Sequence, residues 1–270
     1  MKVRLDGRDV EYVVSGAGPW VTLVHALGCN LEMWWPQLSA LERCYTVLRY
    51  DIRGHGGSSP VAGPYSFPDL AADGLNLLDH LGVEKTHFVG LSLGGMIGQH
   101  LALTEPGRLL SLTLASTTSR YPAEALVMWA ERLEIVERQG LEPLIAPTLA
   151  RWFTPSYMQT HPEVMDRIGG MIRGTSVAGY QGCGYCVPRM NLTARLAEIA
   201  LPCQVLVGEQ DVGTPPAMAR EIARTVRGAQ LAVIAQASHL CNIEQADAFN
   251  RLLRAFLDGI SHAPVPAGSI

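Results

Sequence analysis

The chain alternates between short apolar runs rich in β-branched residues and longer segments with helical spacing. Short runs of this kind are typical of strands that are buried on both faces of a sheet. They occupy residues 20–24, 45–50, 86–89, 109–114, 204–207 and 231–234. Nearer the start, residues 3–5 and 10–14 flank Asp6-Gly7-Arg8, which predicts a β-hairpin ahead of the buried strands.

Several segments between these runs place apolar residues at the spacing of one helix face. One stripe is formed by Leu70, Leu75, Leu77, Leu78 and Leu81. Others occupy residues 96–103, 217–226 and 246–257. Strands that alternate with helices indicate a mostly parallel, doubly wound sheet with right-handed crossovers. The predicted fold class is therefore α/β.

The alternation stops between residues 121 and 195. This stretch has helical patterns interrupted by Pro and Gly, and it is too long for a connecting loop. It predicts a helical cap, residues 121–195, inserted into a core made of residues 1–120 and 196–260. Residues 261–270 have no periodicity and are expected to form a flexible tail. The aromatic residues of interest in the cap are Trp129, Trp152, Tyr180 and Tyr185.

Composition narrows the class of protein without naming a function. Of the 270 residues, 48% are hydrophobic and 17% charged, which suits a globular chain with a sizeable core. The net charge of −4 and the absence of any Lys/Arg run argue against nucleic acid or an anionic membrane as partner. The sequence shows no spanning apolar stretch and no secretory signal, so we expect a cytoplasmic protein.

The six cysteines are scattered, and free thiols in a reducing compartment are the natural expectation. One CxxC is present, Cys183-Gly184-Tyr185-Cys186. A structural zinc site normally needs four ligands, and the sequence has no second CxxC and no HxxxH pair. We therefore predict two ordinary thiols there, with no metal and no cofactor.

The strongest chemical signal is the segment Gly90-Leu91-Ser92-Leu93-Gly94-Gly95. It follows a predicted strand and opens a predicted helix, which is the context of a nucleophile elbow. A serine on so tight a turn requires small residues two positions before and after it, and Gly90 and Gly94 stand there. A glycine-rich nucleotide-binding turn is the alternative, but the chain has neither a GxGxxG nor a P-loop lysine. Ser92 is therefore the predicted nucleophile.

A serine hydroxyl needs a base to take its proton, and in this arrangement the chain order is serine, acid, histidine. Of the eight histidines, His239 alone lies between the last predicted strand and the last predicted helix. The acid should follow an earlier strand, and Asp211 follows residues 204–207, with Glu209 as the alternative. Asp211 would hold the tautomer of His239 and stabilise its imidazolium, which completes a catalytic triad.

The tetrahedral intermediate of such a reaction needs two hydrogen-bond donors for its oxyanion. One is expected to be the backbone N–H of Leu93, directly after the nucleophile. The other is expected from the loop after residues 20–24, which reads His25-Ala26-Leu27-Gly28. We assign it to the N–H of Leu27, with that of Ala26 as the alternative, and expect His25 to brace the loop.

A second polar segment reads Asp51-Ile52-Arg53-Gly54-His55-Gly56-Gly57-Ser58. Asp51 as a metal ligand and His55 as a base are conceivable roles. Charged residues beside a glycine cluster at a strand end are more typical of a turn that braces a loop. We expect such a turn, with Arg53 paired inside the protein.

Five segments together carry a resemblance to a known family: LRYDIRGHGGSS, HFVGLSLGGMIGQ, RWFTP, GEQDVGTPP and ASHLCNIEQADAFN. The chain resembles the 3-oxoadipate enol-lactonase group of the α/β-hydrolase superfamily from about residue 20 to residue 257. The RWFTP segment lies in the cap, which the general fold does not demand. The resemblance implies the α/β-hydrolase fold with a helical cap, and triad roles for Ser92, Asp211 and His239.

The chain departs from that group at two places. It has Val24-His25-Ala26-Leu27-Gly28 where a Ser-Asn-Ser-Leu-Gly type of segment is common, and Pro188-Arg189-Met190-Asn191 where an Arg-Asp-x-Asp pattern is expected. Because the cap sets selectivity in this fold, the second departure concerns the substrate. The candidates for contact with it are Trp129, Arg151, Trp152, Tyr185 and Arg189. Arg151 or Arg189 would pair with a substrate carboxylate, and the alternative is that both are solvated surface residues.

The sequence therefore predicts a cofactor-free serine hydrolase that cleaves a small carboxylic ester or lactone, with 3-oxoadipate enol-lactone as the leading substrate. A carboxylesterase or arylesterase of broad specificity is the alternative, and perhydrolase activity through the same acyl-enzyme is compatible with these residues. An alternative from outside the enzyme class is a small-molecule receptor built on this fold, which would turn over an ester slowly or not at all. No partner besides the substrate is expected, and a homo-oligomer is left open.

Overall fold

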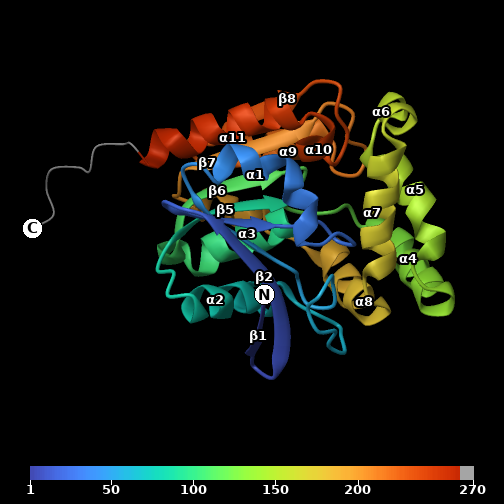
Figure 1. The fold of residues 1–270 in the computed structure, drawn as a ribbon. Helices are drawn as coiled ribbons and strands as arrows, with labels where there is room; N and C mark the ends of the chain where they lie inside the picture. Colours follow the sequence, from blue (N-terminus) through green and yellow to red (C-terminus); the bar gives the residue numbers. More distant parts are fainter. Residues whose placement is uncertain (262–270) are drawn as a thin grey trace, which may run out of the picture.

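An eight-stranded sheet with the order β1-β2-β4-β3-β5-β6-β7-β8 runs through the computed structural model, which describes residues 1–261 (Figure 1). The strands are β1 (Lys2–Leu5), β2 (Arg8–Gly16), β3 (Trp20–Val24), β4 (Thr46–Tyr50), β5 (Thr86–Leu91), β6 (Leu109–Ala115), β7 (Cys203–Gly208) and β8 (Gln230–Ile234). β2 pairs antiparallel with β1 and β4, and every other neighbouring pair is parallel. The hairpin and the mostly parallel sheet are confirmed.

One strand differs from its prediction in burial. Residues 231–234 were expected to be buried on both faces, but Leu231 and Val233 in β8 are 37% and 41% exposed. β8 is an edge strand that pairs with β7 alone among the described strands. An edge strand has a neighbour on one side only, so its apolar pattern does not guarantee burial.

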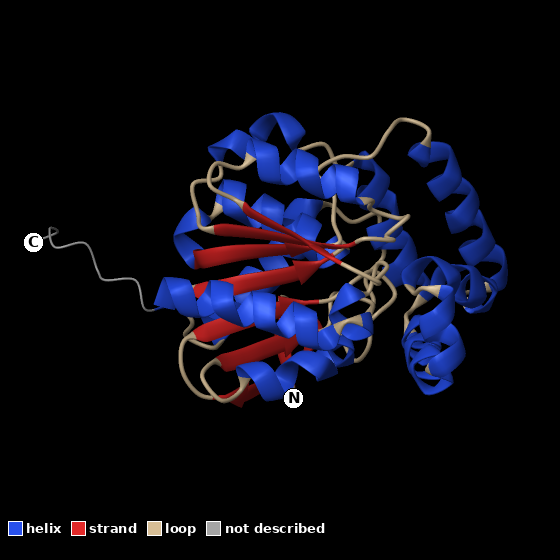
Figure 2. Cartoon of the chain, turned by 90° about the horizontal axis from the view of Figure 1, so that it is seen from above, coloured by secondary structure: helices blue, strands red, loops and turns tan. Residues whose placement is uncertain are grey.

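Helices cover both faces of the sheet, as Figure 2 shows. α1 (Trp35–Leu41) packs against α11 (Ala246–Ser261), and α2 (Phe67–His80) packs against α3 (Leu93–Thr104). α9 (Pro216–Thr225) lies against β7 and β8. α2 begins where Ser66 and Asp69 satisfy each other's backbone N–H groups in a capping box. The doubly wound α/β fold is thus confirmed, with helices at the segments where the periodicity predicts them.

The segment between β6 and β7 forms a separate group of helices on one side of the molecule (Figure 1). These are α4 (Ala125–Gln139), α5 (Glu142–Trp152), α6 (Pro155–Thr160), α7 (Pro162–Gly174) and α8 (Val177–Cys186). The segment leaves and rejoins the core at one place, since Arg120 bridges Asn191 and the N–H of Leu192 donates to the carbonyl of Ser119 at 2.8 Å. We call this group of helices the cap.

Short helices complete the connections. They are η1 (Leu31–Trp34), η2 (Pro106–Arg108), η3 (Val187–Arg189), η4 (Thr193–Glu198) and α10 (Cys241–Glu244). α11 ends at Ser261, and the rest of the tail predicted at residues 261–270 lies outside the described residues. Within the described part of the chain, no helix has both the length and the apolar character needed to cross a membrane.

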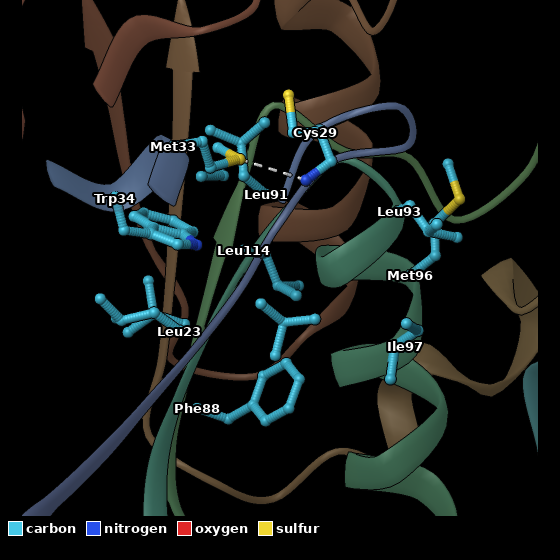
Figure 3. Close-up of a cluster of buried hydrophobic side chains, with 14 of the residues drawn as sticks. Leu23, Cys29, Met33, Trp34, Phe88, Leu91, Leu93, Met96, Ile97 and Leu114 are labelled. Atoms are coloured by element: carbon cyan, nitrogen blue, oxygen red, sulfur yellow. Dashed lines mark hydrogen bonds between the residues drawn. The ribbon is translucent and has the colours of Figure 1, made fainter. Parts of the chain in front are cut away.

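An apolar core lies beneath the turn that joins β5 to α3 (Figure 3). Its members are 0–2% exposed and include Leu23, Cys29, Met33, Trp34, Phe88, Leu91, Leu93, Met96, Ile97 and Leu114. Gly98 lets α3 approach the strand closely, because a Cβ atom there would lie 2.7 Å from Cε1 of Phe88. Burial of one large apolar side chain is worth about 1.5–3 kcal/mol. The turn that carries Ser92 is therefore supported on both sides by fully buried side chains.

Candidate active site

Ser92 stands on the turn between β5 and α3 in a backbone conformation that side chains rarely adopt. Its φ is 55° and its ψ is −111°, which is strained for a residue other than glycine. A Cβ atom on Gly90 would lie 2.2 Å from the carbonyl oxygen of Gly94, and one on Gly94 would lie 2.1 Å from that of Val24. The hydroxyl of Thr117 donates to the carbonyl of Ser92 at 2.8 Å. These contacts form the elbow that the glycine spacing predicts, with Ser92 half-buried at its tip.

His239 and Asp211 meet from the loops that follow β8 and β7. Nδ1 of His239 lies 2.8 Å from Oδ2 of Asp211, and the two residues are 4% and 2% exposed. A proton on Nδ1 donates to the carboxylate and leaves Nε2 free to accept one. Asp211 also accepts from the N–H of Gly213 at 2.8 Å and from the N–H and hydroxyl of Thr214 at 2.9 and 2.8 Å.

The surroundings of Asp211 favour its charged form. Burial alone would raise its pKa, but the charge interaction and hydrogen bond with His239, with the hydrogen bonds from Thr214, lower the pKa overall. Glu209, the alternative acid, is exposed and accepts from the N–H of Gln236 at 3.2 Å. The geometry therefore favours Asp211 over Glu209 as the partner of His239.

A cavity of about 520 Å³ lies where the cap meets the ends of the strands. This volume is within the usual range for small-molecule sites. Ser92 and His239 both line it. The full lining is Leu27, Ser92, Tyr121, Met128, Trp129, Glu131, Arg132, Ile135, Leu144, Pro147, Arg151, Trp152, Tyr180, Val212, Gly213 and His239. The serine, the histidine and a set of cap residues are thus brought to one space.

The candidates for binding a developing oxyanion are the backbone N–H of Leu93, directly after Ser92, and that of Leu27, which lines the cavity together with Ser92. Leu93 is the first residue of α3, where an N–H has no acceptor within the helix. Within residues 1–261, no group accepts a hydrogen bond from the N–H of Leu27 or of Leu93. The N–H of Ala26, the alternative donor, is directed instead to Sδ of Met33 at 3.3 Å. The structure therefore favours Leu27 over Ala26.

His25 braces the loop that carries Leu27, as the sequence predicts. Its Nδ1 lies 2.8 Å from the carbonyl oxygen of Ala26, and its Nε2 accepts from the N–H of Ile52 at 2.9 Å. Burial, with a smaller effect of the neighbouring His55, lowers the pKa of His25 to about 3. The ring is therefore neutral and serves as a fixed link between two loops.

The polar turn after β4 is structural in the same way. Asp51 accepts from the N–H groups of Leu31 and Gly57, each at 2.7 Å. Burial raises the pKa of Asp51 to about 6, although these two hydrogen bonds act to lower it. Arg53 pairs with the buried carboxylate of Asp73 through two hydrogen bonds. The turn is held by contacts within itself and with η1 and α2, and it contributes no residue to the cavity wall.

Three of the five predicted substrate-binding residues line the cavity: Trp129, Arg151 and Trp152. The Trp152 ring stacks on His239, with 5.9 Å between ring centroids and 24° between the planes. Trp152 therefore lines the cavity and also supports the ring of His239.

The structure does not bring Tyr185 and Arg189 to the cavity, which corrects the expectation that they contact the substrate. Both are exposed, at the end of α8 and in η3. Nη1 of Arg189 donates to the carbonyl of Tyr185 at 2.7 Å, and its guanidinium lies 3.7 Å from the centre of the Tyr185 ring. The guanidinium of Arg189 is thus paired at the surface with the backbone carbonyl and the ring of Tyr185.

Arg132 lines the cavity from α4, although the sequence did not single it out. Its guanidinium donates to the hydroxyl of Tyr180 and, at 2.8 Å, to that of Thr148. It also lies 5.6 Å from the ring centre of Trp129. The spacing of three residues from Trp129 places both side chains on one helix face and was the available signal. Tyr180, one of the aromatic residues of interest in the cap, and Tyr121 also line the cavity, and neither was among the predicted substrate contacts.

Arg132 and Arg151 give the cavity a positive wall. Burial lowers the pKa of Arg151, and the charge of Arg132 lowers it further. Among residues 1–261, the guanidinium of Arg151 has no hydrogen-bond or ion-pair partner, and that of Arg132 donates to hydroxyls alone. Glu131 also lines the cavity, but it is exposed and forms no ion pair with either arginine. Two half-buried cations without an acidic partner are suited to an anionic group of a bound molecule.

Cys183 and Cys186 lie one turn apart on α8, and both are buried and free. Burial raises the pKa of the Cys186 thiol to about 12. A thiol with a raised pKa carries little reactive thiolate. In the described part of the chain, no group of three or more His, Cys, Asp or Glu side chains is arranged to hold a metal ion.

The chain is similar to hydrolases along nearly its whole length. It is 34% identical to 3-oxoadipate enol-lactonase 2 of Acinetobacter baylyi over 260 residues, which cover 95% of this chain and 96% of that protein. The crystal structure of the enol-lactonase from Burkholderia xenovorans LB400 matches with a TM-score of 0.92 at 34% identity, covering 96% of this chain and 100% of that one. A thermophilic esterase from Thermogutta terrifontis, solved with malate bound, matches with a TM-score of 0.91 at 29% identity over 96% and 98% of the two chains.

A family model described as the alpha/beta hydrolase fold matches residues 19–246. That range begins just before β3, passes through the whole cap and ends beyond His239. The strand order and the turn that carries Ser92 are those expected of the family that these similarities indicate. The chain is a hydrolase that belongs to the α/β-hydrolase fold family.

Proposed function

We propose that the protein is a serine hydrolase that cleaves a small carboxylic ester or lactone through an acyl-enzyme. The proposal depends above all on the 2.8 Å contact between His239 and Asp211, with His239 and Ser92 lining one cavity. A histidine oriented by a carboxylate and placed in the same cavity as a serine on a strained turn can activate the serine hydroxyl.

The reaction proceeds in two halves. Nε2 of His239 takes the proton of Ser92 while Oγ attacks the substrate carbonyl carbon, and the N–H groups of Leu27 and Leu93 stabilise the oxyanion. His239 then gives the proton to the leaving oxygen as the ester bond breaks. In a lactone that oxygen stays on the acyl group, so the ring opens. Water, deprotonated by His239, attacks the acyl-enzyme, and Ser92 recovers its proton as the acid leaves.

The replacement Ser92→Ala tests this proposal. We expect kcat for a nitrophenyl ester to fall by at least about 10³-fold, because loss of a triad member leaves only binding and oxyanion stabilisation. Mass spectrometry should show that an organophosphonate adds one phosphonyl group to the peptide that contains Ser92 in the wild type, and none to the same peptide of the variant. A variant with more than a few per cent of wild-type activity contradicts the assignment. Fewer than one turnover by the wild type would favour a receptor.

The leading substrate is 3-oxoadipate enol-lactone. The enol-lactonases of Acinetobacter baylyi and Burkholderia xenovorans LB400 are each 34% identical to this chain. A lactone of this type carries a free carboxylate, which is costly to bury without a partner. Arg132 and Arg151 supply a partner in the cavity wall. An assay of the purified protein on the enol-lactone tests this choice directly.

A carboxylesterase or arylesterase of broad specificity is the second candidate. Three apolar residues combine a place in the cavity lining with an exposed surface: Met128 is 60%, Val212 68% and Ile135 37% exposed. An apolar entrance suits neutral aliphatic or aromatic esters. The ratio of kcat/KM for the acidic lactone to that for a neutral phenyl ester separates the two candidates.

A further inference from the structure

A buried carboxylate outside the cavity lining joins the cap to the loop that carries His239. Glu244, the last residue of α10, is 6% exposed and does not line the cavity. It forms no ion pair with any of residues 1–261, and the donors around its carboxylate are backbone N–H and hydroxyl groups. No step of the proposed reaction uses it.

The two oxygens of Glu244 divide between the cap and the histidine loop. Oε1 accepts from the backbone N–H of Thr154 at 3.0 Å and from the hydroxyl of the same residue. Oε2 accepts from the N–H of Ser238, the residue before His239, at 2.8 Å. Thr154 follows the end of α5 and is the N-cap of α6. One side chain therefore fixes both segments of backbone.

Further contacts connect the same two segments. The hydroxyl of Ser238 donates to the carbonyl of Arg151 at 2.9 Å, and the N–H of Leu240 donates to the carbonyl of Trp152 at 3.1 Å. The stacking of Trp152 on His239 adds a contact between side chains. Residues 151–154 and 238–240 thus form one unit, with Glu244 bonded to both parts of it.

We propose that Glu244 is a positioning residue that couples the substrate-binding side of the cap to the catalytic histidine. It sets the ring of His239 relative to Ser92, and it sets Arg151 and Trp152 relative to the bound substrate. The inference rests on the proposed function, because it assigns Glu244 a role in that reaction. A change at Glu244 should therefore alter both the chemical step and the binding of an acidic substrate.

The contacts require a carboxylate, which accepts hydrogen bonds at both oxygens. A glutamine at this position must direct its NH₂ group either toward the N–H of Ser238 or toward that of Thr154. In either orientation two donors face each other and one buried N–H loses its acceptor, so the backbone must shift. Misplacement of a catalytic group by about 1 Å can cost ~100-fold in rate.

The first variant is Glu244→Gln. We expect kcat for a neutral phenyl ester to fall ~10- to 100-fold, since His239 is displaced from Ser92. KM for the acidic lactone should rise severalfold at the same time, because Arg151 moves with the cap segment. Both constants are measured at a temperature well below the melting point of the variant.

The second variant, Thr154→Val, separates the two effects. It removes one hydroxyl donor on the cap side and leaves the bond between Glu244 and Ser238 in place. We expect KM for the acidic lactone to rise, with kcat for the neutral ester within about twofold of wild type. Thr154→Ser keeps the hydroxyl and should restore the wild-type KM.

Asp73→Asn is the matched control, because Asp73 is a buried carboxylate, 7% exposed, that pairs with Arg8 and Arg53 and does not line the cavity. It should lower the melting temperature and leave kcat and KM unchanged. If Glu244→Gln behaves in the same way, Glu244 is merely structural and the inference is overturned. If Glu244→Gln does not fold, Thr154→Val decides the matter, and an unchanged KM there overturns it. Activity that survives Ser92→Ala would instead overturn the proposed function itself.

Discussion

The loops at the strand ends and the helices of the cap both border the cavity. The side chains of these two regions are held in place in different ways. Ser92 is set by the backbone, in a turn too tight for a Cβ atom at Gly90 or Gly94. The carboxylate of Asp211 is set by hydrogen bonds from His239 and from two neighbouring residues of its own loop. In the cap, by contrast, the guanidinium of Arg151 has no partner among residues 1–261.

This difference matches the two tasks that we propose for the site. Groups that move protons must be in place before the substrate arrives, so their hydrogen bonds are satisfied within the protein. Groups that recognise an anion must keep donors free for it, as Arg151 does, and the backbone of Arg151 is held by the hydrogen bond that its carbonyl accepts from the hydroxyl of Ser238. Replacements at the strand ends should therefore act on kcat, and replacements in the cap should act on KM for particular substrates.

The largest effect is expected for Asp211→Asn. Asp211 accepts from the N–H groups of Gly213 and Thr214 with Oδ1 and from Nδ1 of His239 with Oδ2. An asparagine has one acceptor oxygen and an NH₂ donor in place of the other, so one of these contacts is lost. The neutral amide also no longer stabilises the imidazolium, so kcat should fall by roughly 10⁴-fold. Steady-state kinetics on both an acidic lactone and a neutral ester should show equal losses. Glu209→Gln is the control, and its kcat should stay within a factor of about three. A large loss for Glu209→Gln with a small one for Asp211→Asn would reverse the assignment.

The strand-end residues could be predicted from the sequence because local patterns determine their positions. Ser92 sits between an apolar strand and a helix, with glycine two residues to either side. Asp211 and His239 follow strands of a parallel sheet, and the carboxyl ends of such strands meet at one edge. The burial of β8 could not be predicted, since an apolar run does not reveal whether another strand or helix will cover it.

A smaller and substrate-dependent effect is expected for Arg151→Met. Loss of a charge-assisted hydrogen bond costs about 1.5–3 kcal/mol, so KM for the acidic lactone should rise ~10- to 100-fold. Turnover of a neutral phenyl ester should barely change. Arg132→Met should act in the same direction, with some added loss because Tyr180 and Thr148 lose their donor. Equal losses on both substrates, or none on either, would favour the broad esterase.

The cap residues were harder to predict for a physical reason. An arginine on an amphipathic helix is compatible with a solvated surface, a helix interface or a binding site, and only the packing of the helix decides among them. Arg132 was missed for this reason, although Trp129 shares its helix face. Arg189 was selected by its place in a departing sequence segment, which carries no information on the direction of its side chain.

The smallest effect is expected for Arg189→Met. Arg189 is exposed, and its guanidinium contacts the ring and the backbone carbonyl of Tyr185. We therefore expect kcat and KM to stay within about twofold of wild type on both the acidic lactone and the neutral ester. A cation–π contact at an exposed site is worth about 0.5–1 kcal/mol, so the melting temperature should fall by only a few degrees.

This variant is the sharpest test of the boundary between the cavity and the cap surface. Arg151→Met and Arg189→Met remove the same charge from the same insertion, so a general electrostatic attraction of the anionic substrate would make both raise KM, and added salt would abolish both effects. Direct pairing in the cavity would make Arg151→Met alone raise KM, with less dependence on salt. A strong rise in KM for Arg189→Met that persists at high salt would require η3 to turn toward the cavity when the substrate binds.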